Sequence, residues 1–253
     1  GRYTDAVSTV ASDSVSAVHA DGGLGGGGSG GGFVASGSVD GAVRVWRASL
    51  FPEQAHALGG LHSKMVAAVR VHAASDRVYS AGYDRAVFAF AASTGHCVGQ
   101  FGGAGVIGGA LDGEDVREPA VELGDERAAL LHGHSREVTA LHVSGDGSRL
   151  LSGGHDSRLI LWDARSFAAL RSFDTEFPVC CVALTASASS SASAALAGTS
   201  RGQLRGFDAE TGRAALRLDY CKHLLSALAV DECDGADGGS GGIGAAAAAA
   251  VAA

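Results

Sequence analysis

The sequence predicts an all-β fold made of repeated antiparallel sheets. Three observations support it: short apolar segments alternate with polar residues, Gly/Asp turns separate these segments, and the pattern recurs along the chain. The clearest copy runs from His132 to Asp163, HGHSREVTALHVSGDGSRLLSGGHDSRLILWD. Segments with a period of two residues, joined by tight turns, are typical of an antiparallel meander.

Three strands are expected in this copy, in order. Val138–Val143 alternates toward one face and is followed by a turn at Gly145–Gly147. Leu150–Gly153 is a second short apolar strand, and His155–Ser157 forms the next tight turn. Leu159–Trp162 is the third strand, and an aspartate follows it directly.

This stretch resembles a WD repeat, which opens on Gly-His and ends on Trp-Asp at about this spacing. The resemblance implies a β-propeller, in which each repeat forms one blade. Three more copies keep parts of the pattern: Phe33–Trp46, Val78–Phe90 and Leu196–Phe207. The turn positions of the four copies are 40, 84, 156 and 201, which gives intervals of 44, 72 and 45 residues. A blade takes roughly 40–45 residues, so the long interval contains one blade and an insertion.

We therefore expect residues 1–253 to be part of a single propeller. The expected blades lie near residues 13–58, 62–101, 132–173 and 178–218, with a partial fifth at 222–253. Residues 103–130 form an acidic, Gly-rich insertion, and residues 22–32 and 235–244 form Gly-rich loops. Most members of the family close a ring of seven blades, so the resemblance implies that these four to five blades are an incomplete arc.

The partial fifth blade is predicted from two segments near the end of the chain. Leu225–Val230 matches the first-strand pattern of Val138–Val143, and Ala245–Ala253 takes the place of a second strand. Alanine has the highest helix propensity of all residues, so a helix at Ala245–Ala253 is the alternative.

The net charge of −8 is placed unevenly along the chain. Residues 103–130 carry seven acids and two arginines, and four more acids lie within residues 231–237, which leaves +1 on the remainder. The blades are therefore nearly neutral and contain no basic run. Binding to a phosphate backbone requires clustered basic residues, so nucleic-acid binding through this chain is disfavoured.

The five cysteines match no zinc or redox spacing. No signal peptide precedes the first repeat, and no apolar run is long enough to cross a bilayer. We expect an intracellular protein that does not enter a membrane. The sequence does not distinguish between the cytoplasm, the nucleus and a cytoskeletal structure.

Catalytic patterns in the sequence lack the context that their chemistry needs. Gly27–Gly31 fits G-x-S-x-G through Ser29, and Gly103–Gly108 fits G-x-G-x-x-G, but no helix is expected after either. His132 and His134 have no third metal ligand at suitable spacing. We predict no enzyme activity, no cofactor and no metal site.

The resemblance implies a structural role for four residues of the clearest repeat: His134, Ser152, Asp156 and Trp162. In the family, the turn aspartate accepts from the histidine, the histidine contacts the serine hydroxyl, and the serine accepts from the indole N–H. A satisfied buried network of this kind fixes strand register. The second repeat keeps the first three residue types but ends in Phe90, so its relay stops short.

Leu150–Arg165 also resembles the longer DWD box. In the family, such boxes mark substrate receptors that dock on the propeller adaptor of cullin-RING ubiquitin ligases. The matching contact positions are Asp156, Asp163 and Arg165. Most of the pattern is already present in a well-formed WD repeat, and Arg165 alone adds information because an arginine there can form charge-assisted bonds to a partner.

The resemblance implies a non-catalytic scaffold for protein–protein interactions within a multiprotein complex. The first alternative is a ubiquitin-ligase substrate receptor that docks through Leu150–Arg165. The second is a component of an RNA–protein assembly, which would need basic surface from outside this chain. The insertion at residues 103–130 is either a contact for a basic partner or a solvated loop.

Overall fold

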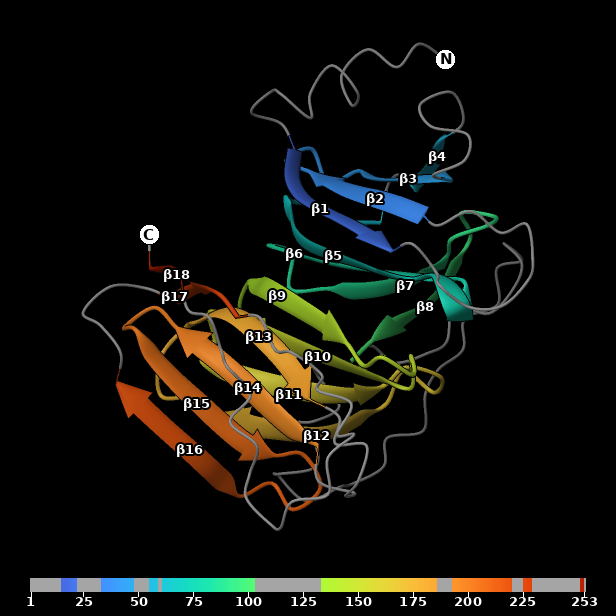
Figure 1. The fold of residues 1–253 in the computed structure, drawn as a ribbon. Coiled ribbons are helices and arrows are strands. Elements are labelled where there is room, and N and C mark those ends of the chain that lie inside the picture. Colours follow the sequence, from blue (N-terminus) through green and yellow to red (C-terminus); the bar gives the residue numbers. More distant parts are fainter. Residues whose placement is uncertain are drawn as a thin grey trace, which may run out of the picture.

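The computed structural model describes residues 15–21, 33–47, 55–58, 61–102, 133–185, 193–219, 225–228 and 251–252. Over these ranges the chain consists of β-strands and a single 3-10 turn, η2 (Ala73–Ser75). The strands form four antiparallel sheets of four strands and one pair of strands (Figure 1). The predicted all-β fold is confirmed. We call the four-stranded sheets blades one to four, and the two-stranded sheet the fifth sheet.

In each blade the strands are hydrogen-bonded in chain order. Blade one contains β1 (Val15–Asp21), β2 (Phe33–Ser38), β3 (Val43–Arg47) and β4 (Ala55–Leu58). Blade two contains β5 (Val66–His72), β6 (Arg77–Gly82), β7 (Val87–Ala91) and β8 (Cys97–Phe101). Blade three contains β9 (Val138–Val143), β10 (Arg149–Gly154), β11 (Arg158–Asp163) and β12 (Ala169–Asp174). Blade four contains β13 (Val179–Thr185), β14 (Ala194–Thr199), β15 (Gln203–Asp208) and β16 (Ala214–Asp219).

The blades are arranged around their first strands. Strand β1 contacts β5, β5 contacts β9, and β9 contacts β13. Figure 1 shows the four sheets fanned around this row, with the fourth strands farther out. This arrangement is that of propeller blades, and it brings the loops of neighbouring blades together at each end of the strands.

Apolar side chains from facing blades form the core. Between blades three and four, Leu159 and Phe173 pack against Val179 and Phe207, and the two phenylalanine ring centroids are 5.1 Å apart. Gly153 allows the close approach, since a Cβ there would lie 2.5 Å from a methyl carbon of Val179. Alternation along each strand thus supplies one apolar face to each neighbouring blade.

The fifth sheet contains β17 (Leu225–Ala227) and β18 (Val251–Ala252), which pair antiparallel. The rest of the two predicted segments, Leu225–Val230 and Ala245–Ala253, lies almost entirely outside the described residues. The Cys181 thiol on β13 donates to the Leu225 carbonyl at 3.2 Å. Burial raises the pKa of this thiol to about 12, so it packs as a protonated, unreactive group.

The predicted insertion at residues 103–130 and the predicted loops at residues 22–32 and 235–244 lie outside the described residues. The chain leaves blade two at Gly102 and returns to blade three at Gly133, and these two glycines are in contact. A Cβ on Gly102 would lie 2.7 Å from the Gly133 Cα and 2.9 Å from the Trp162 ring. Both glycines have positive φ, +68° and +67°, where glycine is favoured.

Within the described ranges, no helix combines the length and apolar character that a membrane crossing requires.

Candidate functional site

The four predicted relay residues of blade three lie in one hydrogen-bonded chain. The Nδ1 atom of His134 lies 3.0 Å from the Asp156 carboxylate, and its Nε2 atom lies 2.7 Å from the Ser152 hydroxyl. The Trp162 indole N–H donates to that hydroxyl oxygen at 2.8 Å. Because an ionised carboxylate can only accept, the histidine carries a proton on Nδ1, and the serine oxygen accepts from the indole. Each member is therefore satisfied.

The Asp156 carboxylate also connects two loops of blade three. It accepts from the backbone N–H of Ser135, in the loop before β9, at 3.0 Å, and from that of Arg158, after the β10–β11 turn, at 3.2 Å. Burial raises the pKa of Asp156, but the bonds from His134 and the two backbone groups outweigh burial, so the pKa lies below its ordinary value. The carboxylate stays ionised, and its oxygens accept hydrogen bonds from within blade three.

Blade two contains the same relay without its last member. The His62 Nδ1 atom lies 2.9 Å from the Asp84 carboxylate, and Nε2 lies 2.7 Å from the Ser80 hydroxyl. Phe90 takes the position of the tryptophan and is buried, but it has no N–H to donate. Burial lowers the pKa of His62 despite the nearby Asp84 carboxylate, so its imidazole is neutral at pH 7.

Blades one and four lack the full residue set. In blade one, Ser36 and Trp46 are buried, whereas Asp40 is exposed and accepts from the backbone N–H of Ala42 at 2.9 Å. In blade four, Arg201 stands in the turn at the position of the aspartate and is exposed. The turn residue and its contacts therefore differ from blade to blade.

Asp163, one of the three DWD-box positions, holds the turn between β11 and β12. Its Oδ1 atom accepts from the backbone N–H groups of Arg165 at 2.8 Å and Ser166 at 2.9 Å. These bonds lower its pKa. Asp208 forms the same turn in blade four, where it accepts from the N–H groups of Glu210 and Thr211. This structural role was not anticipated from the sequence.

The other two DWD-box positions differ in accessibility. The Asp156 side chain is only 3% exposed, and its oxygens are occupied by the relay. Arg165 is exposed, and within the described part of the chain its guanidinium makes no hydrogen bond or ion pair. Among the DWD-box positions, Arg165 is thus the side chain that is accessible to a partner protein.

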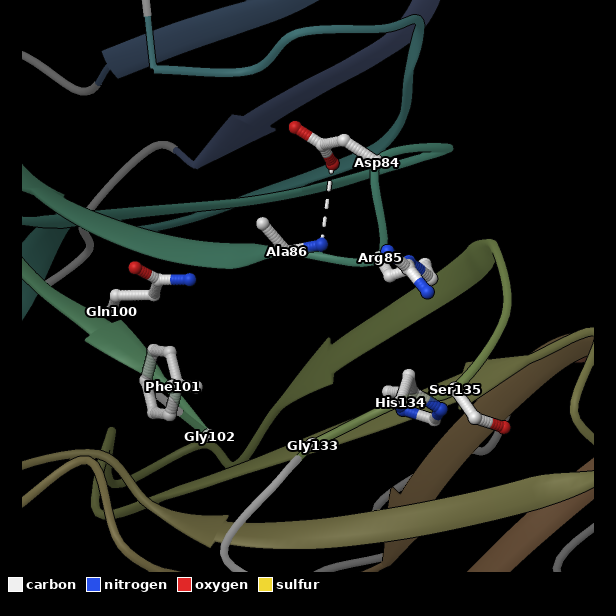
Figure 2. A pocket seen from close by; sticks show the side chains of 9 residues that line it. All are labelled: Asp84, Arg85, Ala86, Gln100, Phe101, Gly102, Gly133, His134 and Ser135. Carbon is white, nitrogen blue, oxygen red and sulfur yellow. Dashed lines mark hydrogen bonds between the residues drawn. The ribbon is translucent and has the colours of Figure 1, made fainter. Parts of the chain in front are cut away.

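A cavity of about 380 Å³ lies between blades two and three (Figure 2). Its lining comes from the β6–β7 turn, the end of β8 and the loop before β9: Asp84, Arg85, Ala86, Gln100, Phe101, Gly102, Gly133, His134 and Ser135. The sequence did not point to this cavity, because its lining comes from three segments that only the blade packing brings together. It contains exposed donors, on Arg85 and Ser135, but no paired carboxylates or nucleophile–base pair.

A metal site is not found in the described residues, since they contain no group of three or more His, Cys, Asp or Glu side chains placed to bind an ion.

Comparison with known proteins identifies the repeats. The family model for the WD domain, G-beta repeat, matches residues 4–47 and 126–163. The chain is 43% identical to WD repeat-containing protein 18 of Bos taurus over 63 residues, and 39% identical to that of Rattus norvegicus over 69 residues. It is 41% identical to WD repeat-containing protein slp1 of Schizosaccharomyces pombe over 58 residues.

The chain contains repeats of the WD-repeat family. The matches cover 25%, 27% and 23% of this chain, and 15%, 16% and 11% of the respective relatives, so the chain spans only a small part of the proteins it matches. The second matched segment, residues 126–163, ends at the Trp-Asp of blade three, the blade with the complete relay. In blade three the buried side chains of His134 and Ser152 are both members of this relay.

Proposed function

We propose that this WD-repeat chain is a non-catalytic scaffold that binds other proteins inside the cell, as part of a multiprotein complex. One observation supports the proposal. The histidine, aspartate and serine side chains of blade three, which are residue types found in catalytic sites, bind one another inside the blade. His134 and Asp156 bind each other, and Ser152 is fully enclosed. A rigid set of blades with exposed loops at both ends is suited to presenting contact residues.

Affinity purification of the full-length protein, followed by mass spectrometry, tests this proposal. We expect a reproducible set of partners in near-stoichiometric amounts that is retained at moderate salt. A protein that elutes alone at physiological concentration would contradict the scaffold role.

The second candidate is a ubiquitin-ligase substrate receptor, and the free guanidinium of Arg165 favours it. A surface arginine without a partner contributes little to folding, whereas an arginine at the centre of an interface can contribute several kcal/mol to binding. We expect Arg165→Ala to abolish co-purification with the propeller adaptor of the ligase while the melting temperature stays the same.

Arg213→Ala is the matched control, because Arg213 is also exposed and precedes a fourth strand, β16. Equal loss of the adaptor in both variants, or no adaptor with the wild-type protein, would leave Leu150–Arg165 as a well-formed repeat only.

A further inference from the structure

The turn between β11 and β12, which carries Arg165, contains a phenylalanine at a position suited to glycine. Phe167 has a φ of +60°. At the equivalent position, the turns of blades two and four have Gly95 and Gly212, with φ values of +76° and +78°. In all three turns the backbone N–H of this residue donates to the carbonyl four positions earlier, at 2.8–2.9 Å. A left-handed conformation is unfavourable for a residue with a Cβ, so the contacts of the Phe167 side chain must compensate for it.

The Phe167 side chain makes these contacts with blade two. Its ring lies over Gly99 in the middle of β8, where a Cβ would be 2.7 Å from a ring carbon. The ring also packs edge to face against Phe101 of the same strand, with the centroids 5.0 Å apart and the planes at 78°. Phe167 is only 9% exposed and belongs to the core cluster between the two blades. Its ring therefore attaches the turn of blade three to the outer strand of blade two.

The junction between blades three and four fills the same space in the opposite way. Arg171 of β12 has the same register as Gly99 of β8, because each is paired with the residue before the aromatic side chain of the third strand. The turn of blade four has Gly212, and a Cβ there would lie 3.4 Å from the guanidinium of Arg171. At each junction one large side chain lies between the turn and the neighbouring blade. Between blades two and three it belongs to the turn, so the turn is anchored through its own residue.

Arg165 lies two residues before Phe167 in the anchored turn. Its backbone N–H and that of Ser166 donate to the Asp163 carboxylate at 2.8 and 2.9 Å, so the backbone around the arginine is hydrogen-bonded. The Arg165 guanidinium is exposed and makes no hydrogen bond or ion pair with the described residues. A contact residue on an ordered backbone loses less conformational entropy on binding than one on a mobile turn. Blade two therefore contributes to the ordering of Arg165 through Phe167.

We propose that Phe167 is the positioning residue for the partner contact at Arg165, and that the docking element is a unit of two blades. The element consists of the turn that carries Arg165, the ring of Phe167, and the part of β8 formed by Gly99 and Phe101. The partner offers a carboxylate, to which the guanidinium can donate through two N–H groups. The proposal rests on the docking role proposed above for Arg165 and extends it to a strand outside Leu150–Arg165.

Gly99→Ala in the full-length protein is the first test, because it changes blade two and leaves all of Leu150–Arg165 in place. The added methyl group takes the space of the Phe167 ring, so the ring and its turn must move. Gly206→Ala is the matched control: this glycine also lies inside a strand, β15 of blade four, and a Cβ there would be 2.9 Å from the Leu216 Cβ. We expect Gly99→Ala to weaken binding of the purified propeller adaptor of the ligase at least fivefold, and Gly206→Ala to leave it within twofold.

Phe167→Gly perturbs the same contact in the opposite direction. It gives the turn the glycine that blades two and four have there, and it leaves the space over Gly99 empty. We expect it to weaken adaptor binding at least as much as Gly99→Ala, although Arg165 itself is unchanged. Biolayer interferometry measures all three variants at a temperature well below their melting temperatures.

Hydrogen exchange separates positioning from a general loss of stability. The amides of Arg165 and Ser166 in blade three, and those of Glu210 and Thr211 in blade four, are bonded to an aspartate in the same way. We expect Gly99→Ala to speed exchange of the first pair at least tenfold and to leave the second pair unchanged. A merely structural role would speed exchange in both turns to the same extent.

Two outcomes would overturn the positioning role and leave the docking role intact: equal effects of Gly99→Ala and Gly206→Ala on binding, or unchanged exchange at Arg165 and Ser166. A wild-type protein that does not bind the adaptor would show instead that the docking role of Arg165 is wrong, and this proposal falls with it.

Discussion

Blades two and three begin the same relay and end it differently. In both, a histidine joins the turn aspartate to a buried serine with nearly identical distances. In blade three the relay continues to Trp162, which connects β11 to β10 through a side-chain bond. In blade two it stops at Ser80, and Phe90 only fills the space. Three residues are thus enough to hold the opening loop to the turn, and the fourth adds a polar connection to the third strand.

The packing of blade two compensates in part for the missing bond. The Phe88 and His62 rings pack edge to face with their centroids 4.8 Å apart, and the centroids of the Phe88 and Phe90 rings are 6.3 Å apart. Aromatic pairs in these geometries contribute about 0.5–1.5 kcal/mol beyond burial. Blade two therefore depends more on apolar contact, and blade three more on a closed polar network.

The largest expected effect comes from removing the turn aspartates. Asp156→Ala should lower the free energy of unfolding toward the upper end of about 1–3 kcal/mol, because His134 and two backbone N–H groups lose their acceptor. Asp84→Ala should cost less, since its relay is already incomplete. Chemical denaturation of both variants measures the difference, and equal losses would count against the relay as the distinction between the blades.

Trp162→Phe converts blade three into a copy of blade two and should cost about 2 kcal/mol, for one lost hydrogen bond and lost packing against Phe101. In this background, Asp156→Ala should cost no more than Asp84→Ala does in the wild type. A double-mutant cycle on denaturation midpoints measures the coupling. Strict additivity would show that the indole and the carboxylate act independently.

Mild acid should loosen blade two. Unfolded His62 has a pKa near 6.5, and burial lowers it in the folded state, so the unfolded chain binds more protons below that pH. The His62 contribution is therefore complete above pH 6.5 and falls with the pH, by at most about 1.4 kcal/mol per pH unit. Hydrogen exchange of β5 and β6 at pH 7.5 and 5.5 measures it, with His62→Gln as the control. Protection that is unchanged, or that rises in acid, would be inconsistent with a neutral buried imidazole.

The smallest expected effect is stabilising. Ser157→Gly should raise the free energy of unfolding by about 0.5 kcal/mol, because relief of the left-handed strain slightly exceeds the entropy that glycine adds to the unfolded chain. Thermal unfolding measures the change. A lower melting temperature would mean that the turn in blade three does not carry this strain, although blades one and four place glycine there.

The strands could be predicted from the sequence because each buries one face and repeats every second residue. Val138–Val143 is a strand in both the prediction and the structure, and Leu150–Gly153 is one residue longer at each end.

The relay of blade three was predictable from the family motif, whereas the cavity was not. A motif records residues that act within one repeat, but the lining of the cavity combines residues of blade two with the loop before β9 of blade three. A signal for Arg85 is nevertheless present in the sequence. Aligning the four turns places Arg85 opposite Gly41 and Gly202, which predicts a left-handed backbone at that position.

Gly102 and Gly133 are in contact, so the segment between them leaves the fold and returns to it at nearly the same place. Closing a loop of n residues costs entropy that grows only as the logarithm of n, so doubling or halving this segment changes stability by about 0.6 kcal/mol. The junction is therefore a point where length can vary during evolution without disturbing blades two and three. The same geometry makes it a graft site, where a reporter domain with adjacent termini can replace the segment.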